Sequence, residues 1–262
     1  MRKPFPWRIF WILLAAAAFG LIAIVPYSLA LQANSPALQQ LPMPLALLVA
    51  LQIGLQVVGF AAAIALGLFF AGRAGLGLPL LEAALRGERP ADRLRRILLP
   101  SIGLGVAGSL LVIGLDTYVF GPALQAQLAG AASGAAPAAA PAAWKGLLAS
   151  FYGGIDEEIL LRLLVMSFLA WLGRFVSRTP EGKPTTAVYW VANLLAAVLF
   201  GLGHLPATAA ILPITPLVVL RAVALNGLVG VACGYLYFRH GLEAAMLSHF
   251  SADLVLHVLF AL

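Results

Sequence analysis

The stretch GGIDEEILLRLLVMSFLAWLG, residues 153–173, decides the fold class. Beyond its acidic first turn, Arg162 is the only charged residue, so the segment has the composition of a membrane-spanning helix. The first turn carries Asp156, Glu157 and Glu158. A charge inside hydrocarbon costs about 3 kcal/mol even on lenient insertion scales, so such residues normally face a protein interior or a wet cavity. They are therefore candidates for function.

Spacing separates the two glutamates. Glu158 and Arg162 are four positions apart, so they share one helix face and can neutralise each other. Glu157 points about 100° away and cannot easily share that partner. An unpaired carboxylate in an apolar pocket is suited to act as a general base. We expect Glu158 and Arg162 to form a structural ion pair that orients the helix, and Glu157 to react.

Composition identifies a polytopic, all-α helix bundle in the cell membrane. Of the 262 residues, 62% are hydrophobic and 10% are charged, against about 25% charged in soluble domains. The net charge of +6 lies mostly in short loops, which fits insertion topology and lipid headgroups better than nucleic acid. The single cysteine, Cys233, excludes an internal disulfide and a multi-cysteine metal site, and we expect it to pack as a small hydrophobe.

Apolar stretches predict the membrane spans. They cover about residues 7–32, 44–70, 97–120, 155–173 and 187–204, and a last span begins at His249. The stretch 205–238 is either one helix, giving seven spans, or two helices with a break near Arg221–Asn226, giving eight. Loop charge favours seven. We adopt eight, because polar groups in hydrocarbon need one another and an even number of later crossings brings His249 to the depth of Glu157 and His204.

The chain divides into three regions. Residues 1–120 form an N-terminal three-span region with an arginine-rich loop at 73–96. Residues 121–143 are a low-complexity Ala/Gly/Pro segment, expected to be a flexible loop. Residues 144–262 form the catalytic bundle, in which 144–152 is expected to lie at the membrane interface.

Two further patterns place polar residues four apart on helices. Phe200 and His204 share one face at a helix end, and two glycines between them allow close approach of another backbone. His249 and Asp253 also share one face, where the carboxylate fixes the imidazole tautomer. The alternatives are a histidine that caps a helix terminus and a His–Asp pair that braces the last helix.

Together, Glu157, His204, His249 and Asp253 have the composition of a hydrolytic site. A Glu/His pair can activate water directly, or the same groups can ligate zinc, which then activates the water. The zincin signature, two histidines four apart with an intervening glutamate, is absent. We therefore expect metal-free acid–base hydrolysis with no cofactor, and keep a zinc protease as the alternative.

The remaining polar residues receive lesser roles. Asp116 and Arg221 are expected to act as outer supporting or topology residues, His257 to pack, and His240 to be solvated in a loop. A serine or cysteine nucleophile lacks support, since neither Ser248 nor Cys233 has a defined base and no GxSxG occurs.

These patterns resemble the CAAX prenyl protease and bacteriocin-processing family of intramembrane glutamate-dependent endopeptidases. The family motifs are two glutamates with arginine four positions after the second, Phe-x-x-x-His, and His-x-x-x-Asn/Asp. Here they are EEILLR at 157–162, FGLGH at 200–204 and HFSAD at 249–253, in the same order. The resemblance covers about residues 144–262.

The resemblance implies roles for each residue. Glu157 and His204 would activate the attacking water, and His249 with residue 253 would stabilise the oxyanion; Glu158 and Arg162 would support the helix. The prenyl-processing members carry Asn at the last position, where this chain has Asp253. An ionised aspartate cannot donate a hydrogen bond, so Asp253 either stays protonated or holds His249 as the charged donor. We expect the second, because it costs less.

The substrate implied is a peptide or membrane protein in the bilayer, with or without a lipid. Some family members cleave a CAAX-type tail next to a lipidated cysteine, and others serve bacteriocin processing or immunity. Counting basic loop residues places the motifs on the extracytoplasmic side, whereas prenyl-tail processing is cytosolic. Two alternatives from other classes are a non-catalytic immunity or binding protein and a proton-coupled transporter.

Overall fold

A computed structural model of the chain describes residues 4–33, 41–129, 140–210 and 212–260. Every long element in these ranges is helical, so the predicted all-α class is confirmed. The elements are α1 (Trp7–Ala23), α2 (Val25–Leu31), α4 (Leu45–Ala74), α5 (Pro79–Leu85), α6 (Ala91–Leu115), η1 (Asp116–Phe120), α7 (Gly121–Ala129), α8 (Ala143–Phe151), η2 (Tyr152–Glu157), η3 (Ile159–Met166), α9 (Ser167–Gly173), α10 (Thr186–Gly203), α11 (Leu205–Ala209), α12 (Pro216–His240), α13 (Leu242–Asp253) and η4 (Leu254–Leu259). The η elements are π-helical and continue the α-helices beside them.

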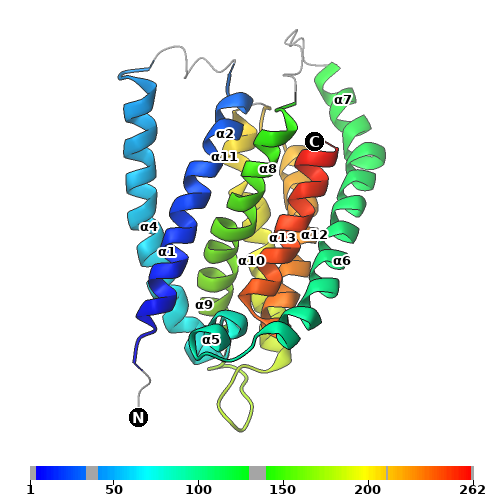
Figure 1. The fold of residues 1–262 in the computed structure, drawn as a ribbon. Coiled ribbons are helices and arrows are strands. Elements are labelled where there is room, and N and C mark those ends of the chain that lie inside the picture. Colours follow the sequence, from blue (N-terminus) through cyan, green and yellow to red (C-terminus); the bar gives the residue numbers. More distant parts are fainter. Residues whose placement is uncertain (1–3, 34–40, 130–139, 211, 261–262) are drawn as a thin grey trace.

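The helices form a polytopic bundle, as predicted (Figure 1). Six of them are long and apolar enough to cross a membrane, beginning with Trp7–Leu31 and ending with Leu242–Leu259. The continuous helix Ala143–Gly173, which carries the acidic turn, has comparable length. Within the described residues this makes seven membrane-length helices, the alternative number considered from the sequence. The chain is a multi-pass membrane protein.

The predicted break near Arg221–Asn226 is wrong, because α12 runs through it without interruption. The reason lies in two side chains. The guanidinium of Arg221 pairs with Asp116 through two bonds of 2.6 Å, and the amide of Asn226 donates to the carbonyl of Ala222 at 2.9 Å. Polar groups that find partners inside the protein do not require the helix to end.

The depth argument for an extra crossing fails for a second reason. The last helix begins at Leu242, so His249 lies inside it and not at its start. A single crossing by α12 therefore brings His249 back to the depth of the acidic turn.

Two other segments differ from the prediction. Residues 121–129, expected to belong to a flexible loop, form α7, and residues 144–152, expected at the membrane interface, continue directly into the acidic helix. Residues 130–139 lie outside the described ranges.

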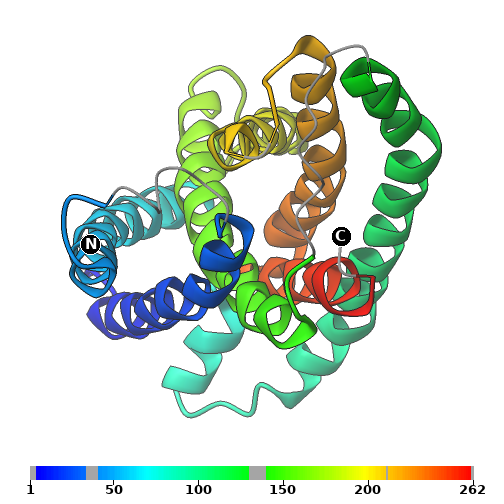
Figure 2. The same cartoon turned by 90° about the horizontal axis from the view of Figure 1, so that it is seen from above.

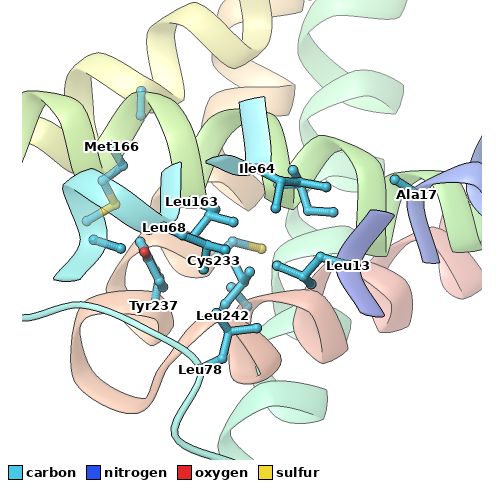
Figure 3. Close-up of a cluster of buried hydrophobic side chains, with 14 of the residues drawn as sticks. Leu13, Ala17, Ile64, Leu68, Leu78, Leu163, Met166, Cys233, Tyr237 and Leu242 are labelled. Carbon is cyan, nitrogen blue, oxygen red and sulfur yellow. The ribbon is translucent and has the colours of Figure 1, made fainter. Parts of the chain in front are cut away.

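The helix Ala143–Gly173 occupies the middle of the bundle. Its π-helical parts pack on α1 and α4 from one side and on α10 and α13 from the other (Figure 2). Figure 3 shows buried apolar side chains of the central helix and its neighbours packed together, among them Leu13 of α1, Ile64 of α4, Leu163 of η3 and Cys233 of α12. Large hydrophobic residues on the outside, such as Leu99 at 81% exposure, face the surroundings, as expected for a protein solvated by lipid.

The loops at the two ends of the bundle differ in charge. The arginine-rich connection around α5 and the basic loop after α9 both lie at the end where the N-terminus begins (Figure 1). His204, at the end of α10, lies toward the opposite end. By the positive-inside rule, the end of the bundle with the basic loops is expected to face the cytoplasm.

Candidate active site

Glu157 stands at the end of the π-helical segment η2, in the middle of the central helix. The two glycines that precede the acidic turn let α13 come close. A Cβ at Gly153 would overlap Oδ2 of Asp253 and would lie 3.2 Å from Nε2 of His249. Only glycine therefore allows these side chains to lie directly against the helix that carries Glu157. π-helical turns of this kind occur frequently at functional sites.

Glu158 and Arg162 form the ion pair that their spacing predicted. Oε1 of Glu158 lies 3.0 Å from Nη1 of Arg162, and both side chains are buried. Nη2 of Arg162 donates to the carbonyl of Gly230 on α12 at 2.7 Å, and the guanidinium stacks 5.1 Å from the ring centroid of Phe200. The pair thus joins the central helix to α12 and α10.

His204 approaches Glu157 from the end of α10. Its Nδ1 lies 2.9 Å from the carbonyl oxygen of Phe200, which accepts only, so Nδ1 carries the proton in this bond. Nε2 lies 3.9 Å from Oε1 of Glu157. The two side chains are 34% and 19% exposed, so neither is fully enclosed by the protein. The gap between these atoms is longer than a direct hydrogen bond.

His249 approaches the acidic turn from α13 and contacts both glutamates. Its Nδ1 donates to Oε1 of Glu158 at 2.7 Å, and its Nε2 lies 3.5 Å from Oε2 of Glu157. The ring of Phe200 packs edge-on against it at 5.4 Å. The bond to Glu158 fixes the orientation of the imidazole and directs Nε2 toward Glu157.

Asp253 lies beside His249, but farther away than expected. Its Oδ1 is 3.6 Å from Nε2 of His249, beyond hydrogen-bond distance. Glu158, which we expected to pair only with Arg162, holds the other ring nitrogen instead. The contact between Glu158 and His249 joins residues 91 positions apart, and no local spacing indicates it.

The sequence-predicted residues fall into two groups. Glu157, Glu158, Arg162, Phe200, His204, His249 and Asp253 come together. Asp116 and Arg221 pair with each other, and His240 ends α12 near the basic loops. His257, expected to pack, instead lies 3.9 Å from Oδ1 of Asp253 and 3.2 Å from the hydroxyl of Tyr27.

Potential metal ligands also cluster here. Among the described residues, Glu158, Cys233 and His249 offer ligand atoms within 4.8 Å of one another. All three are buried, and Glu158 already faces the guanidinium of Arg162. A catalytic zinc ion needs an open position for water and does not favour an adjacent cation. The trio also omits Glu157 and His204, so its donors do not fit a catalytic metal.

Comparison with known families gives one match. Residues 139–255 match the family described as "Type II CAAX prenyl endopeptidase Rce1-like". This part of the chain is therefore similar to the CAAX protease family. Comparison with curated proteins and with solved structures gives no match. The CAAX protease region contains all three motifs, whereas α1, α4 and α6 precede it. This chain is thus a membrane-embedded hydrolase that acts on a peptide or protein in the bilayer, through CAAX-type intramembrane protease activity.

Proposed function

We propose that this protease hydrolyses peptide bonds without a metal ion, with Glu157 and His204 activating the attacking water. One observation carries the proposal. Two imidazoles from two other helices face the carboxylate of Glu157, His204 at 3.9 Å and His249 at 3.5 Å. The neighbouring acid, Glu158, is buried and bonded, so Glu157 is the carboxylate left for acid–base chemistry.

The spacing between Glu157 and His204 suits a bridging water. With its proton on Nδ1, neutral His204 presents Nε2 as an acceptor. A carboxylate oxygen 3.9 Å away is a second acceptor, so one water molecule can donate a hydrogen bond to each. Because the water donates both of its hydrogens, a lone pair on its oxygen is free to attack a carbonyl carbon. The partial exposure of both side chains lets water reach this position.

The reaction follows from these roles. The water oxygen forms a bond to the scissile carbonyl carbon while its proton passes to Glu157. The carbonyl oxygen becomes an oxyanion. When the intermediate collapses, the C–N bond breaks and the proton moves from Glu157 to the leaving amine. The steps need no cofactor, and the products are a carboxylic acid and an amine, which then ionise to a carboxylate and an ammonium group.

His249 is the group that we assign to the oxyanion. In its charged form the ring donates from Nδ1 to Glu158 and keeps Nε2–H for the substrate. Asp253, 3.6 Å from Nε2, adds a negative charge that favours this charged donor. An ionised Asp253 cannot itself donate to the oxyanion. Glu158, Arg162 and Phe200 hold the ring in place.

The substrate we propose is the tail of a membrane protein, cleaved next to a lipidated cysteine. The name of the matched family supports this choice. Bacteriocin-type processing of an unlipidated peptide is the second candidate. A library of tails with and without a prenyl group distinguishes them, because only the first predicts that removal of the lipid raises KM.

The decisive experiment replaces Glu157 by glutamine in purified, reconstituted protein. Glu157→Gln keeps the shape of the side chain but loses the base, so we expect cleavage to fall by at least about a hundredfold. Glu88→Gln is the matched control, because Glu88 is exposed in a loop and pairs only with Arg86 there. Unchanged cleavage in Glu157→Gln would overturn the proposal.

A further inference from the structure

Tyr27 brings the N-terminal part of the chain to the candidate site. It lies on α2, far before the region that matches the family, and its hydroxyl is 3.2 Å from Nδ1 of His257. The two rings also meet edge to face, with centroids 5.4 Å apart. The residues are 230 positions apart, so this contact results from the fold alone.

His257 is the outermost of three polar residues on the last helix. His249, Asp253 and His257 follow at intervals of four and lie along one face of α13 and η4. Oδ1 of Asp253 is 3.6 Å from Nε2 of His249 and 3.9 Å from Nε2 of His257. The carboxylate therefore lies between two imidazoles, and the imidazole of His249 also contacts Glu157.

The hydrogen bond from Tyr27 selects the tautomer that suits Asp253. If the phenol donates, Nδ1 of His257 accepts and the ring proton sits on Nε2. That N–H is on the side facing Oδ1 of Asp253. In this arrangement the hydroxyl of Tyr27 faces the acceptor Nδ1 of His257, and the N–H at Nε2 of His257 faces the carboxylate of Asp253.

Close helix packing fixes this arrangement. α8 packs on both α2 and η4, so it holds the two elements that carry Tyr27 and His257. A Cβ at Gly146 of α8 would overlap the carbonyl oxygen of His257. Glycine at this position lets η4 lie directly on α8, within reach of α2.

We propose that Tyr27 and His257 are positioning residues that hold Asp253 beside His249, so that the N-terminal helices complete the active site. This inference rests on the proposed function, in which His249 stabilises the oxyanion. Without the outer imidazole, the carboxylate of Asp253 turns toward solvent and its charge no longer supports His249. Loss of this charge beside His249 weakens stabilisation of the transition state and does not change substrate binding.

The test measures kcat and KM for Tyr27→Phe and His257→Asn in reconstituted protein. Each variant removes one polar group and little volume. We expect kcat to fall by about fivefold to tenfold, with KM and the melting temperature nearly unchanged, because the lost interaction acts in the transition state. Tyr118→Phe and His240→Asn are the matched controls. Tyr118 is 82% exposed, and His240 ends α12 among the basic loops, so neither change should affect kcat.

A double variant tests whether the two residues act in sequence. In the His257→Asn background, Tyr27→Phe should change kcat by less than about twofold, because residues that act through one another are not additive. Tyr27→Phe should likewise change kcat by less than about twofold in the Asp253→Asn background. Full additivity, or a fall in melting temperature that parallels the fall in kcat, would mean a general packing role and would overturn the inference.

Glu157→Gln, measured beside these variants, separates the two proposals. If Glu157→Gln abolishes cleavage while Tyr27→Phe and His257→Asn retain the parent kcat, the positioning role is wrong and the proposed function stands. If Glu157→Gln cleaves as the parent does, the proposed function fails, and the positioning role fails with it.

Discussion

Nδ1 of His249 donates to Glu158 at 2.7 Å, whereas Asp253, one turn further along the same helix, lies 3.6 Å from the opposite ring nitrogen. Glu158 also lies 3.0 Å from Arg162, so a single buried carboxylate joins a guanidinium to an imidazole. Its neighbour Glu157 faces imidazoles and solvent. The two adjacent acids therefore have different roles: Glu158 is structural and Glu157 is the candidate base. Substitutions at the two positions should have different effects on stability and on activity.

Glu158→Gln should destabilise the protein. The change leaves the guanidinium of Arg162 buried without its counter-charge, and breaking a buried pair in this way costs about 3–5 kcal/mol. Glu157→Gln leaves the Glu158–Arg162 ion pair and the bond from His249 to Glu158 intact, so it should keep the parent stability. Thermal unfolding in one detergent compares the two. Equal destabilisation by both variants would contradict the division of roles.

Gly153→Ala should lower the activity while the fold is retained. The added methyl group overlaps Asp253 and approaches His249, so both side chains must move away from Glu157. We expect kcat to fall at least about tenfold. Gly59→Ala is the control, because nothing lies within 4 Å of a Cβ there and alanine favours a helix by about 1 kcal/mol. Parent-like kcat in Gly153→Ala would argue against the close approach.

Chelation should leave cleavage unchanged, in keeping with the metal-independent proposal. Cys233→Ala is the informative variant, since it removes one member of the trio that includes Glu158 and His249. We expect cleavage within about twofold of the parent, because the buried thiol packs as a small hydrophobe. Stoichiometric zinc in the parent, lost together with activity in Cys233→Ala, would favour the zinc alternative.

Loop charge predicts that the candidate site opens on the membrane side opposite the basic loops, whereas cleavage of a prenylated tail requires a site on the cytosolic side. Cys233 is buried, so single cysteines introduced elsewhere can be labelled selectively with an impermeant thiol reagent. In intact cells, Ala210→Cys, just beyond His204, should react, whereas Glu181→Cys in the basic loop should react only after permeabilisation. The reverse pattern would place the site on the cytosolic side.

Much of the architecture follows from local rules of the sequence. Hydropathy marks the long helices, because backbone polar groups in lipid must be satisfied within each segment. Intervals of four correctly indicated the pair Glu158–Arg162 and the shared faces of Phe200 with His204 and of His249 with Asp253. The juxtaposition of the three motifs was expected from the cost of isolated charges in hydrocarbon.

Contacts that depend on the packing of distant helices could not be predicted. The path of α12 depends on Asp116, 105 positions away, which neutralises Arg221 and removes the reason for a break. Tyr27 carries no local pattern that would connect it to His257. Both contacts join residues that are far apart in the sequence, so only the assembled bundle gives them partners.

Because of its π-helical turns between Tyr152 and Met166, this helix is difficult to reproduce as an isolated synthetic peptide. Such turns are rare, and neighbouring helices must favour them over the regular form. A synthetic peptide with the same residues would return to regular α geometry. Its acidic turn and its aromatic end would then point in different relative directions, so it would serve poorly as an inhibitor or an antigen that mimics this face of the protease.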